Sequence, residues 1–249
     1  MVASAIVDQV VNHTVLIFVG IQGIGKSTFF LNLIPKQLKE YIYSGALNPT
    51  DKDSLIHLSE CILINLDELE TLTKYKESAL KEVITKSEIR IRRPYGRFSE
   101  KMPRHASLCG SVNEQSVLND PSGSRRFLVH KVNSIHYQHQ VNMEQVFAQA
   151  MHLFKTGFTY WFTPLEIQQV HAHNREFEMQ SVEEELLLRH YVPVRSNDSA
   201  GKRYTATELM EQVHQESSGQ AINHSSKIRM GQALAKHGFE HVRSGGITH

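Results

Sequence analysis

Residues 14–28 constrain the fold more than any other part of the chain. The run Thr-Val-Leu-Ile-Phe-Val at residues 14–19 is rich in β-branched and aromatic side chains, as in a strand buried on both faces. A glycine-rich turn at residues 20–25 follows at once, and a helix-like stretch continues to about Glu40. A strand, a glycine-rich turn and a helix in immediate succession indicate an α/β fold built on a parallel sheet.

The turn has the Gly-x-x-x-x-Gly-Lys-Ser pattern of a phosphate-binding loop. Glycines allow backbone torsions that turn several N–H groups toward one phosphate, and the start of the following helix adds partial positive charge. Lys26 can reach the β- and γ-phosphates as a point charge, and the Ser27 hydroxyl can bind Mg²⁺. We therefore predict a nucleotide site made by Gly20, Gly23, Ile24, Gly25, Lys26, Ser27 and Thr28.

A pair of carboxylates follows the next buried strand. Residues 61–66 form the apolar run Cys-Ile-Leu-Ile-Asn-Leu, and Asp67 and Glu68 come directly after it. Asp67 is placed to hold Mg²⁺ through water, and Glu68 could polarise an attacking water. This arrangement predicts an ATP hydrolase, and the alternative interpretation is an acidic helix start. Because Asn119-Asp120 lacks the Asn-Lys-x-Asp pattern that reads guanine, ATP is predicted over GTP, with Mg²⁺ as second cofactor.

The remaining pattern predicts the architecture. Further strands are expected at residues 106–112 and 127–132, with an amphipathic helix at residues 75–84. Strands alternating with helices predict a mostly parallel sheet with helices on both faces. Beyond residue 140 the pattern becomes helical, with capping boxes at Thr163 and Thr205. We expect a P-loop core at residues 1–140, a helical extension at 141–192 and a small unit at 193–249.

Charge is balanced over the whole chain but not within it. The 27 Lys and Arg against 26 Asp and Glu give a net charge of +1, which excludes a uniformly basic nucleic-acid binder. Residues 86–104, however, carry seven basic side chains against two glutamates. Their Ile-Arg-Ile-Arg alternation predicts a hairpin with arginines on one side, suited to a DNA backbone or a stacked single strand. The alternative is a charged edge that prevents aggregation. The candidate DNA-contacting residues are Arg90, Arg92, Arg93, Tyr95 and Arg97.

Polar residues also flank the two later strands. Asn113 follows the strand at residues 106–112, so we expect it at the same sheet edge as the phosphate loop, where an amide can orient water near the γ-phosphate. Its alternative role is that of a simple turn residue. Arg125 and Arg126 open the strand at residues 127–132, and one of them could act as an arginine finger that stabilises the transferring phosphate. The alternative is an electrostatic clamp within the subunit.

Other features of the sequence bear on the cellular compartment in which the protein is found. No run approaches the ~18 apolar residues that a membrane span needs, and the N-terminus lacks the basic start of a secretory signal. Cys61 and Cys109 stand in apolar runs without paired spacing, so we interpret them as reduced core thiols. The histidines lack partner ligands at metal spacing. We expect a cytoplasmic protein without membrane contact.

The order of these motifs resembles the virulence-associated protein E family, ATPases of phages and mobile elements that are similar to superfamily 3 helicases within the AAA+ class. The resemblance spans residues 14–132 and implies a hexameric or ring-like ATPase in the DNA replication of a mobile element. It rests on four segments together, namely Gly20-Ile-Gln-Gly-Ile-Gly-Lys-Ser-Thr-Phe-Phe, Leu66-Asp-Glu-Leu, Arg93-Pro-Tyr-Gly-Arg97 and Gly123-Ser-Arg-Arg-Phe127.

The resemblance also implies roles for single residues. It gives Lys26 and Ser27 the Walker A positions, Asp67 and Glu68 the Walker B positions, Asn113 the sensor position, and Arg125 or Arg126 the finger donated to a neighbouring subunit. The hairpin around residues 92–97 would be the DNA-contacting loop. Two features depart from the family. Val112 replaces the usual threonine before the sensor asparagine, and the first strand begins where relatives often still carry a primase-like region. We expect either a fragment or a separate primase chain.

The last part of the chain is typical of a winged-helix module. A capped helix from Thr205 is followed by a second helix near residues 225–237 and the start of a strand near residue 241. Such a second helix can enter a major groove. Its residues Ile228, Gly231, Leu234 and Ala235 share one face. The chain ends where a wing would return, so we expect this unit to be truncated.

Together the motifs predict an ATP-hydrolysing, helicase-like motor that forms a homo-oligomeric ring on single-stranded or forked DNA. One alternative is a nucleotide-dependent DNA-binding regulator, in which ATP orders an assembly without strand separation. The other is a small-molecule P-loop kinase, which is disfavoured because the arginines lie in a hairpin after the carboxylate pair and not in a lid.

Overall fold

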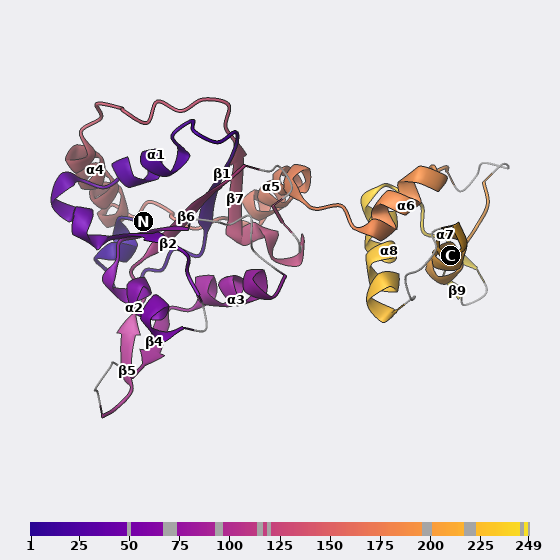
Figure 1. The fold of residues 1–249 in the computed structure, drawn as a ribbon, viewed down its shortest axis with the longest axis horizontal. Helices are drawn as coiled ribbons and strands as arrows, with labels where there is room; N and C mark the ends of the chain where they lie inside the picture. Colours follow the sequence, from indigo (N-terminus) through magenta and orange to yellow (C-terminus); the bar gives the residue numbers. More distant parts are fainter. Residues whose placement is uncertain are drawn as a thin grey trace. The chain divides into compact units, whose positions relative to one another are not determined.

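The computed structural model describes residues 1–48, 51–66, 74–92, 97–113, 117–118, 121–195, 201–216, 223–244 and 247–248. The chain divides into two compact units, Met1–Met179 and Gln180–His249, each of which is described by itself (Figure 1). The stretch predicted as a helical extension, residues 141–192, contributes helices to both units. The predicted division into residues 1–140, 141–192 and 193–249 stays a prediction.

A five-stranded parallel sheet forms the centre of the first unit. Its strands are β1 (Val15–Val19), β2 (Ile42–Gly45), β3 (Leu63–Leu66), β6 (Ser107–Val112) and β7 (Phe127–Lys131). Their order is β2-β3-β6-β1-β7, and all four pairings are parallel. β1 is paired on both sides, with Val19 in register with Val112 of β6 and Lys131 of β7. The predicted α/β fold with a parallel sheet is confirmed.

Helices connect these strands. They are α1 (Lys26–Asn32), α2 (Lys52–Glu60), α3 (Lys74–Thr85), α4 (Met143–Lys155) and α5 (Pro164–Asn174), with short 3-10 helices η1 (Ala3–Ala5), η2 (Lys36–Tyr41), η4 (Pro121–Arg126) and η5 (Arg175–Phe177). The helix expected to reach Glu40 instead ends at Asn32, because Pro35 has no N–H to continue the ladder, and η2 follows. α5 begins at the predicted capping box of Thr163. Within the described residues, no helix combines the length and apolar character needed to cross a membrane.

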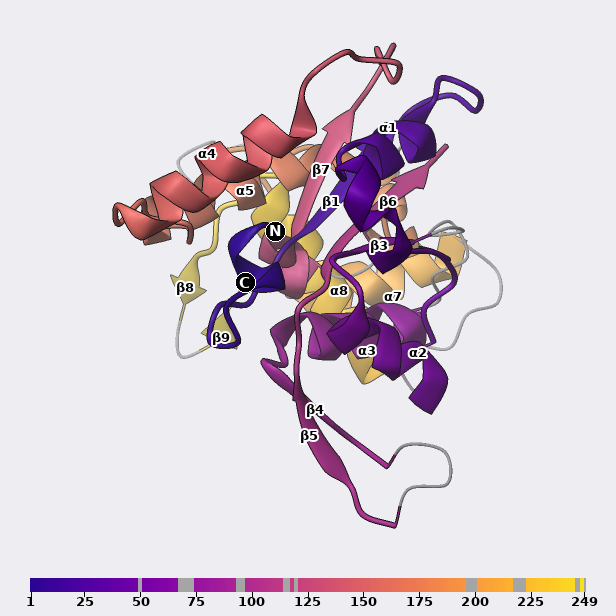
Figure 2. The ribbon, with the colours of Figure 1, turned by 90° about the vertical axis from the view of Figure 1, so that its left-hand side faces the viewer.

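The helices cover both faces of the sheet (Figures 1 and 2). On one face Phe30 of α1 packs with Leu63 and Cys109. On the other face lies a larger apolar cluster that includes Leu58 of α2 and Cys61 just after it. Because both faces are covered, β3 is buried along its whole length. Both cysteines are buried free thiols, as predicted, and burial raises the pKa of Cys61 to about 11.

An antiparallel hairpin, β4 (Glu88–Ile91) and β5 (Glu100–Pro103), extends away from the sheet (Figure 2). Ile89 and Ile91 are buried together with Met102 of the facing strand, whereas Arg90 between them is exposed. The predicted alternation of apolar and basic faces is therefore confirmed. The expected turn at residues 94–96 lies outside the described residues.

Arg104 fastens this hairpin to the core. It follows β5 directly and is 1% exposed. Its guanidinium donates to four backbone carbonyl oxygens, those of Lys86 (3.1 Å), Ile84 (3.2 Å), Ala106 (3.3 Å) and Asn12. Burial lowers the pKa of Arg104 to about 10, which leaves the side chain charged at neutral pH. Arg104 was counted in the predicted basic surface, but its burial removes it from any contact with DNA.

The second unit contains α6 (Val182–His190), α7 (Ala206–Glu216) and α8 (His224–Lys236), followed by the short strands β8 (Arg243–Ser244) and β9 (Ile247–Thr248). Its core is formed by Leu187, Met210, Val213, Met230 and Ala233. This arrangement agrees with the predicted winged-helix-like unit. β9 pairs antiparallel with β8, at the place where the returning strand of the wing was expected to be missing.

The two faces of α8 are clearly distinguished. Met230 and Ala233 are buried in the core of the unit, and Ser226 is buried on the same side. Of the predicted face, Ile228 is 50% exposed and Gly231 and Ala235 are also exposed, whereas Leu234 is half-buried against the core of the unit. The side of α8 that a major groove could accept is therefore largely uncharged.

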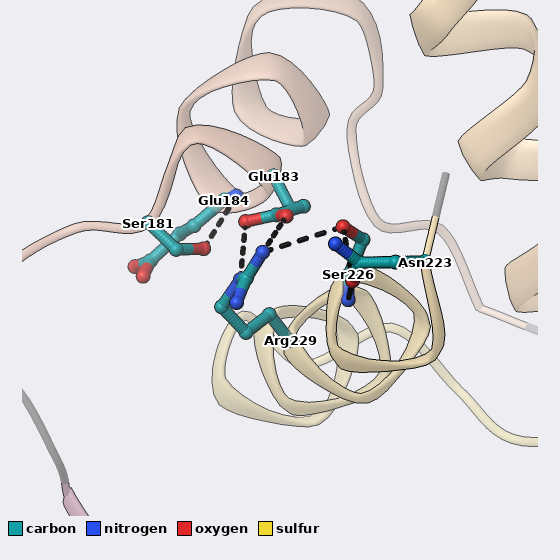
Figure 3. A network of polar contacts seen from close by, with 6 residues as sticks. All are labelled: Ser181, Glu183, Glu184, Asn223, Ser226 and Arg229. Atoms are coloured by element: carbon teal, nitrogen blue, oxygen red, sulfur yellow. Dashed lines mark hydrogen bonds and ion pairs between the residues drawn. The ribbon is translucent and has the colours of Figure 1, made fainter. Parts of the chain in front are cut away.

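A charged network joins α6 to α8 (Figure 3). Arg229 donates to both carboxylate oxygens of Glu183, from Nε to Oε2 at 2.8 Å and from Nη2 to Oε1 at 2.6 Å, and to Ser226 Oγ at 3.3 Å. The caps of the two helices, Ser181 and Asn223, lie in the same network. Burial opposes ionisation of Glu183, but the hydrogen bonds from Arg229 and Ser226 outweigh it and lower its pKa to about 2.

Replacing Glu183 by Gln should destabilise the second unit by about 1–2 kcal/mol, because the buried Glu183 side chain loses its charge-assisted hydrogen bonds with the half-exposed Arg229. Chemical unfolding followed by a probe in the second unit measures this. Glu185→Gln on the same helix is the matched control, because Glu185 and Arg189 are 60% and 61% exposed and should contribute little.

The effect should depend on pH. Since folding lowers the pKa of Glu183 from 4.5 to about 2, its contribution to stability is present above pH 4.5 and is lost as the pH falls toward 2. Wild type and Glu183→Gln should therefore converge in stability over that window. A Glu183→Gln variant as stable at neutral pH as Glu185→Gln would contradict the role of this ion pair.

Candidate functional site

The glycine-rich loop leaves the carboxyl end of β1 and enters α1. Gly20 N donates to Val112 O of β6 at 3.1 Å, which extends the sheet contacts into the loop. Gly23 and Gly25 have φ angles of 86° and 88°, in the left-handed region that favours glycine. A Cβ on Gly20 would lie 2.2 Å from Val132 O. The structure therefore needs glycine at all three predicted positions.

Lys26 lies inside this loop. It is 6% exposed, and its Nζ donates to Gly20 O at 2.5 Å, to Ile21 O at 2.9 Å and to Asn113 Oδ1 at 3.2 Å. The ammonium is thus held against the loop by oxygen atoms, which phosphate oxygens could replace. A phosphate bound by the loop would meet this charge directly.

Strand order brings Asn113 to the loop. β6 lies between β1 and β3, and all three strands are parallel, so the residues that follow them share one edge of the sheet. Asn113 follows β6 and is exposed, at the position that the sequence predicted. Asp67 and Glu68 come next after β3 in the chain but lie outside the described residues. The chemical roles of all three residues stay predictions.

Ser111 is a site residue that sequence reasoning missed. Its Oγ lies 3.2 Å from Ser27 Oγ, the hydroxyl predicted to bind Mg²⁺. Ser111 stands one position before Val112, the residue that replaces the family's usual threonine. A hydroxyl from β6 therefore does reach the phosphate loop, but from the neighbouring position.

The remaining residues of the predicted nucleotide and Mg²⁺ site lie in or near the first turn of α1, except Asp67. Ile24 is half-buried, and Thr28 is exposed on the first turn of α1. Among the described residues, no group of three His, Cys, Asp or Glu side chains could hold a metal ion. The Ser27 hydroxyl fits a Mg²⁺ whose other ligands are phosphate oxygens, water and few protein groups. The predicted carboxylate partner, Asp67, is not among the described residues.

Arg125 and Arg126 lie at the opposite edge of the sheet. They end η4 just before β7, which runs parallel to β1, so they stand at the amino end of the strands. Arg125 is exposed and Arg126 is half-buried. Strands of five residues span about 16 Å. The structure therefore does not bring either arginine together with Lys26 of the same chain.

Asn174, also missed from the sequence, holds the backbone of this arginine pair. It is fully buried, and its Nδ2 donates to Ser124 O and Phe127 O, both at 2.8 Å. These carbonyls stand on either side of Arg125 and Arg126. The nearby His171 lies 2.7 Å from Ser124 Oγ through its Nδ1. The signal was hidden because Asn174 lies on α5, far from the arginines in the chain.

Replacing Asn174 by Ala should remove the side-chain donor from two backbone carbonyls and lower the free energy of unfolding by about 2–3 kcal/mol. Nucleotide affinity should not change, since the phosphate loop is at the other edge of the sheet. Chemical unfolding and nucleotide titration measure the two effects. Gln168→Ala removes an exposed amide from the same helix and is the control. Equal stability of the two variants would show that Asn174 does not hold this backbone.

The hairpin offers a separate, basic surface. Arg90, Arg92 and Arg97 are exposed, and they make no ion pair with the described residues. The exposed lysines of the hairpin differ, because Lys86 and Lys101 are each paired with a glutamate. Three of the five predicted DNA-contacting residues are therefore available for an anionic ligand.

An exposed aromatic ring accompanies these arginines. Phe98 is 80% exposed and follows Arg97 directly. Sequence reasoning missed Phe98 and chose Tyr95 as the aromatic residue, which with Arg93 lies outside the described residues. An exposed ring next to exposed arginines is the combination that stacks on bases of a single strand.

The fold and the loop define a class of protein. A glycine-rich phosphate loop joins the carboxyl end of a doubly paired parallel strand to a helix, whose first residue is the lysine of the motif. This is the arrangement of a P-loop-like α/β core.

The comparisons with known proteins identify the family. The virulence-associated protein E-like domain matches residues 1–179, so the chain belongs to that family, as the motif order predicted. Comparison with curated proteins found no significant match. Three apo structures of the NrS-1 C-terminal region are similar at 17–18% identity, with TM-scores of 0.38–0.42. They match over 68–72% of this chain, which spans only 35–45% of their length.

Proposed function

We propose that the protein hydrolyses ATP and uses the energy to move on or melt DNA during replication of a phage or another mobile element. Membership of the virulence-associated protein E-like family supports this setting, which the motif resemblance implied. The phosphate loop supports nucleotide binding, and the exposed arginines of the hairpin support contact with DNA.

The contact between Lys26 and Asn113 carries the proposal. A lysine that neutralises the β- and γ-phosphates and an amide that orients the attacking water must approach the same phosphate. Their side chains meet at 3.2 Å, although they stand 87 residues apart in the chain. The position of β6 beside β1 produces this meeting.

The other residues then take complementary parts. The loop N–H groups would bind the phosphates, and Lys26 would offset the charge that develops on them. Ser27 and Asp67 would hold Mg²⁺, which shares in neutralising the phosphate charge. Glu68 would accept a proton from the attacking water, and Asn113 would orient that water.

A homo-oligomeric ring accounts for the two arginines. Arg125 and Arg126 face the opposite edge of the sheet from Lys26, so neither serves the nucleotide of its own chain. In a ring one of them would reach the nucleotide of the next subunit as an arginine finger. Hydrolysis would then be coupled between subunits, and movement of the hairpin could pull on a single strand.

Replacing Lys26 by Ala should lower ATP turnover by at least about a hundredfold, because the charge on the transferring phosphate loses its main protein partner. Phosphate release under saturating ATP and Mg²⁺ measures this effect. Lys36→Ala, an exposed lysine beyond α1, is the control and should retain turnover. Unchanged turnover in Lys26→Ala would exclude the assignment.

The same assay separates the motor from the other function classes. Single-stranded or forked DNA should stimulate the ATPase of a motor. A DNA-binding regulator would bind DNA without increased turnover, and a small-molecule kinase would not respond to DNA. Solution mass measured with nucleotide tests the ring.

Removing two hairpin charges should weaken DNA binding without changing stability. Arg90→Gln/Arg92→Gln loses two exposed cations, so the slope of log affinity against log salt should become shallower by about 1–2. Fluorescence anisotropy over a salt series measures the slope. Lys36→Gln/Lys155→Gln removes the same charge from exposed sites elsewhere in the first unit. If both double variants lose affinity equally, the hairpin is only a charged edge.

A further inference from the structure

A segment that no motif singled out runs across the phosphate loop. After β7 the chain passes through residues 132–141, here called the crossing segment, and lies over α1 before α4 begins (Figure 1). Val132 N donates to Val19 O at 2.7 Å, so the crossing segment starts as a continuation of the sheet. At its far end Asn142 caps α4. Both ends are therefore anchored.

The ring of Tyr137 lies directly against the phosphate loop. A Cβ built on Gly25 would lie 2.2 Å from Tyr137 Cδ1 and 2.7 Å from Cγ, so the ring is in contact with the Gly25 α-carbon. The backbone of Tyr137 is held separately, because Asn32 Nδ2 donates to Tyr137 O at 2.8 Å. The ring is thus positioned by contacts at both ends of α1.

The crossing segment follows one side of α1. Gly25, Phe29 and Asn32 are spaced by four and three residues, which places them on the same side of the helix. The Phe29 ring meets the His139 ring edge-to-face, with centroids 5.9 Å apart. Both ring nitrogens of His139 are buried, and neither has a hydrogen-bond partner among the described residues. A buried polar group of this kind is costly unless something pairs with it.

We propose that Tyr137 and His139 form the nucleoside subsite of the phosphate loop, with the base stacked on the Tyr137 ring. The inference rests on the proposed nucleotide site. A nucleotide with its phosphates in the loop must extend its ribose and base beyond it, and Thr28 is exposed there between Gly25 and Phe29. Tyr137 supplies an aromatic ring beside this position. A small shift of His139 would let its unpaired nitrogen bond to the nucleoside.

Stacking has a consequence for specificity. Every base has a π face, so stacking tolerates all bases. The subsite therefore raises affinity for nucleotides without selecting adenine over guanine. Ligands that lack a base gain no affinity from the Tyr137 ring.

The test compares ligands with and without a base, on the whole chain, by calorimetric titration with ADP, GDP and inorganic tripolyphosphate. Tyr137→Ala should bind ADP and GDP about tenfold more weakly and should bind tripolyphosphate like the wild type. Tyr137→Leu keeps a bulky apolar side chain but has no π face, so it should behave like Tyr137→Ala. Tyr137→Phe should bind like the wild type, and His136→Ala, an exposed neighbour, is the control.

Two results would overturn the subsite. If Tyr137→Leu binds ADP as tightly as the wild type, the ring makes no contact with the base. If Tyr137→Leu loses affinity for ADP and for tripolyphosphate by the same factor, Tyr137 only supports the conformation of the loop. Failure of the nucleotide site looks different, because the wild type would then bind neither ligand, or Lys26→Ala would bind both normally.

Discussion

The position of β1 between β6 and β7 is the constraint on which the rest of the first unit depends. Hydrogen bonds on both sides hold β1 in parallel register, with Val19 level with Val112 and Lys131. Because parallel strands end at a common edge, the phosphate loop, Asn113 and the start of the crossing segment emerge side by side. The contact of Lys26 with Asn113 and that of Gly20 with Val132 both follow from this pairing. An edge strand could not place partners on both sides of the loop.

Buried polar side chains attach the outlying parts to this frame. Arg104 binds four carbonyl oxygens at the base of the hairpin, and Asn174 binds two around the Arg125–Arg126 pair. In both places a buried side-chain donor satisfies backbone carbonyl oxygens. The neighbouring arginines, Arg90 and Arg125, stay exposed. Rigid support beneath exposed cations is what recognition of an anionic partner requires, whether DNA or a neighbour's nucleotide.

The proposed activity joins surfaces that the fold keeps apart. Phosphate chemistry is assigned to the carboxyl edge of the sheet, and the arginine pair lies at the amino edge, so an assembly of several copies would bring them together. The hairpin carries the proposed DNA contacts at a third place on the first unit. The second unit has its own core and its own ion pair between Glu183 and Arg229. An exposed, largely uncharged face of α8 distinguishes this unit from the basic hairpin.

Local features could be predicted from the sequence because local physics sets them. Glycine torsions define the loop at residues 20–25, alternation defines the hairpin faces, and side-chain caps define the start of α5. The end of α1 and the elements β2 and α2 were missed. The sequence signal of β2 is weak because it is a half-exposed edge strand whose partner, β3, is distant in the chain. Folding alone reveals that Arg104 is buried and that Arg125 and Arg126 stand opposite Lys26. It also reveals that Ser111, Asn174 and Tyr137 lie against residues predicted for the site. These facts depend on strand order and on contacts between residues far apart in sequence, which no local pattern encodes.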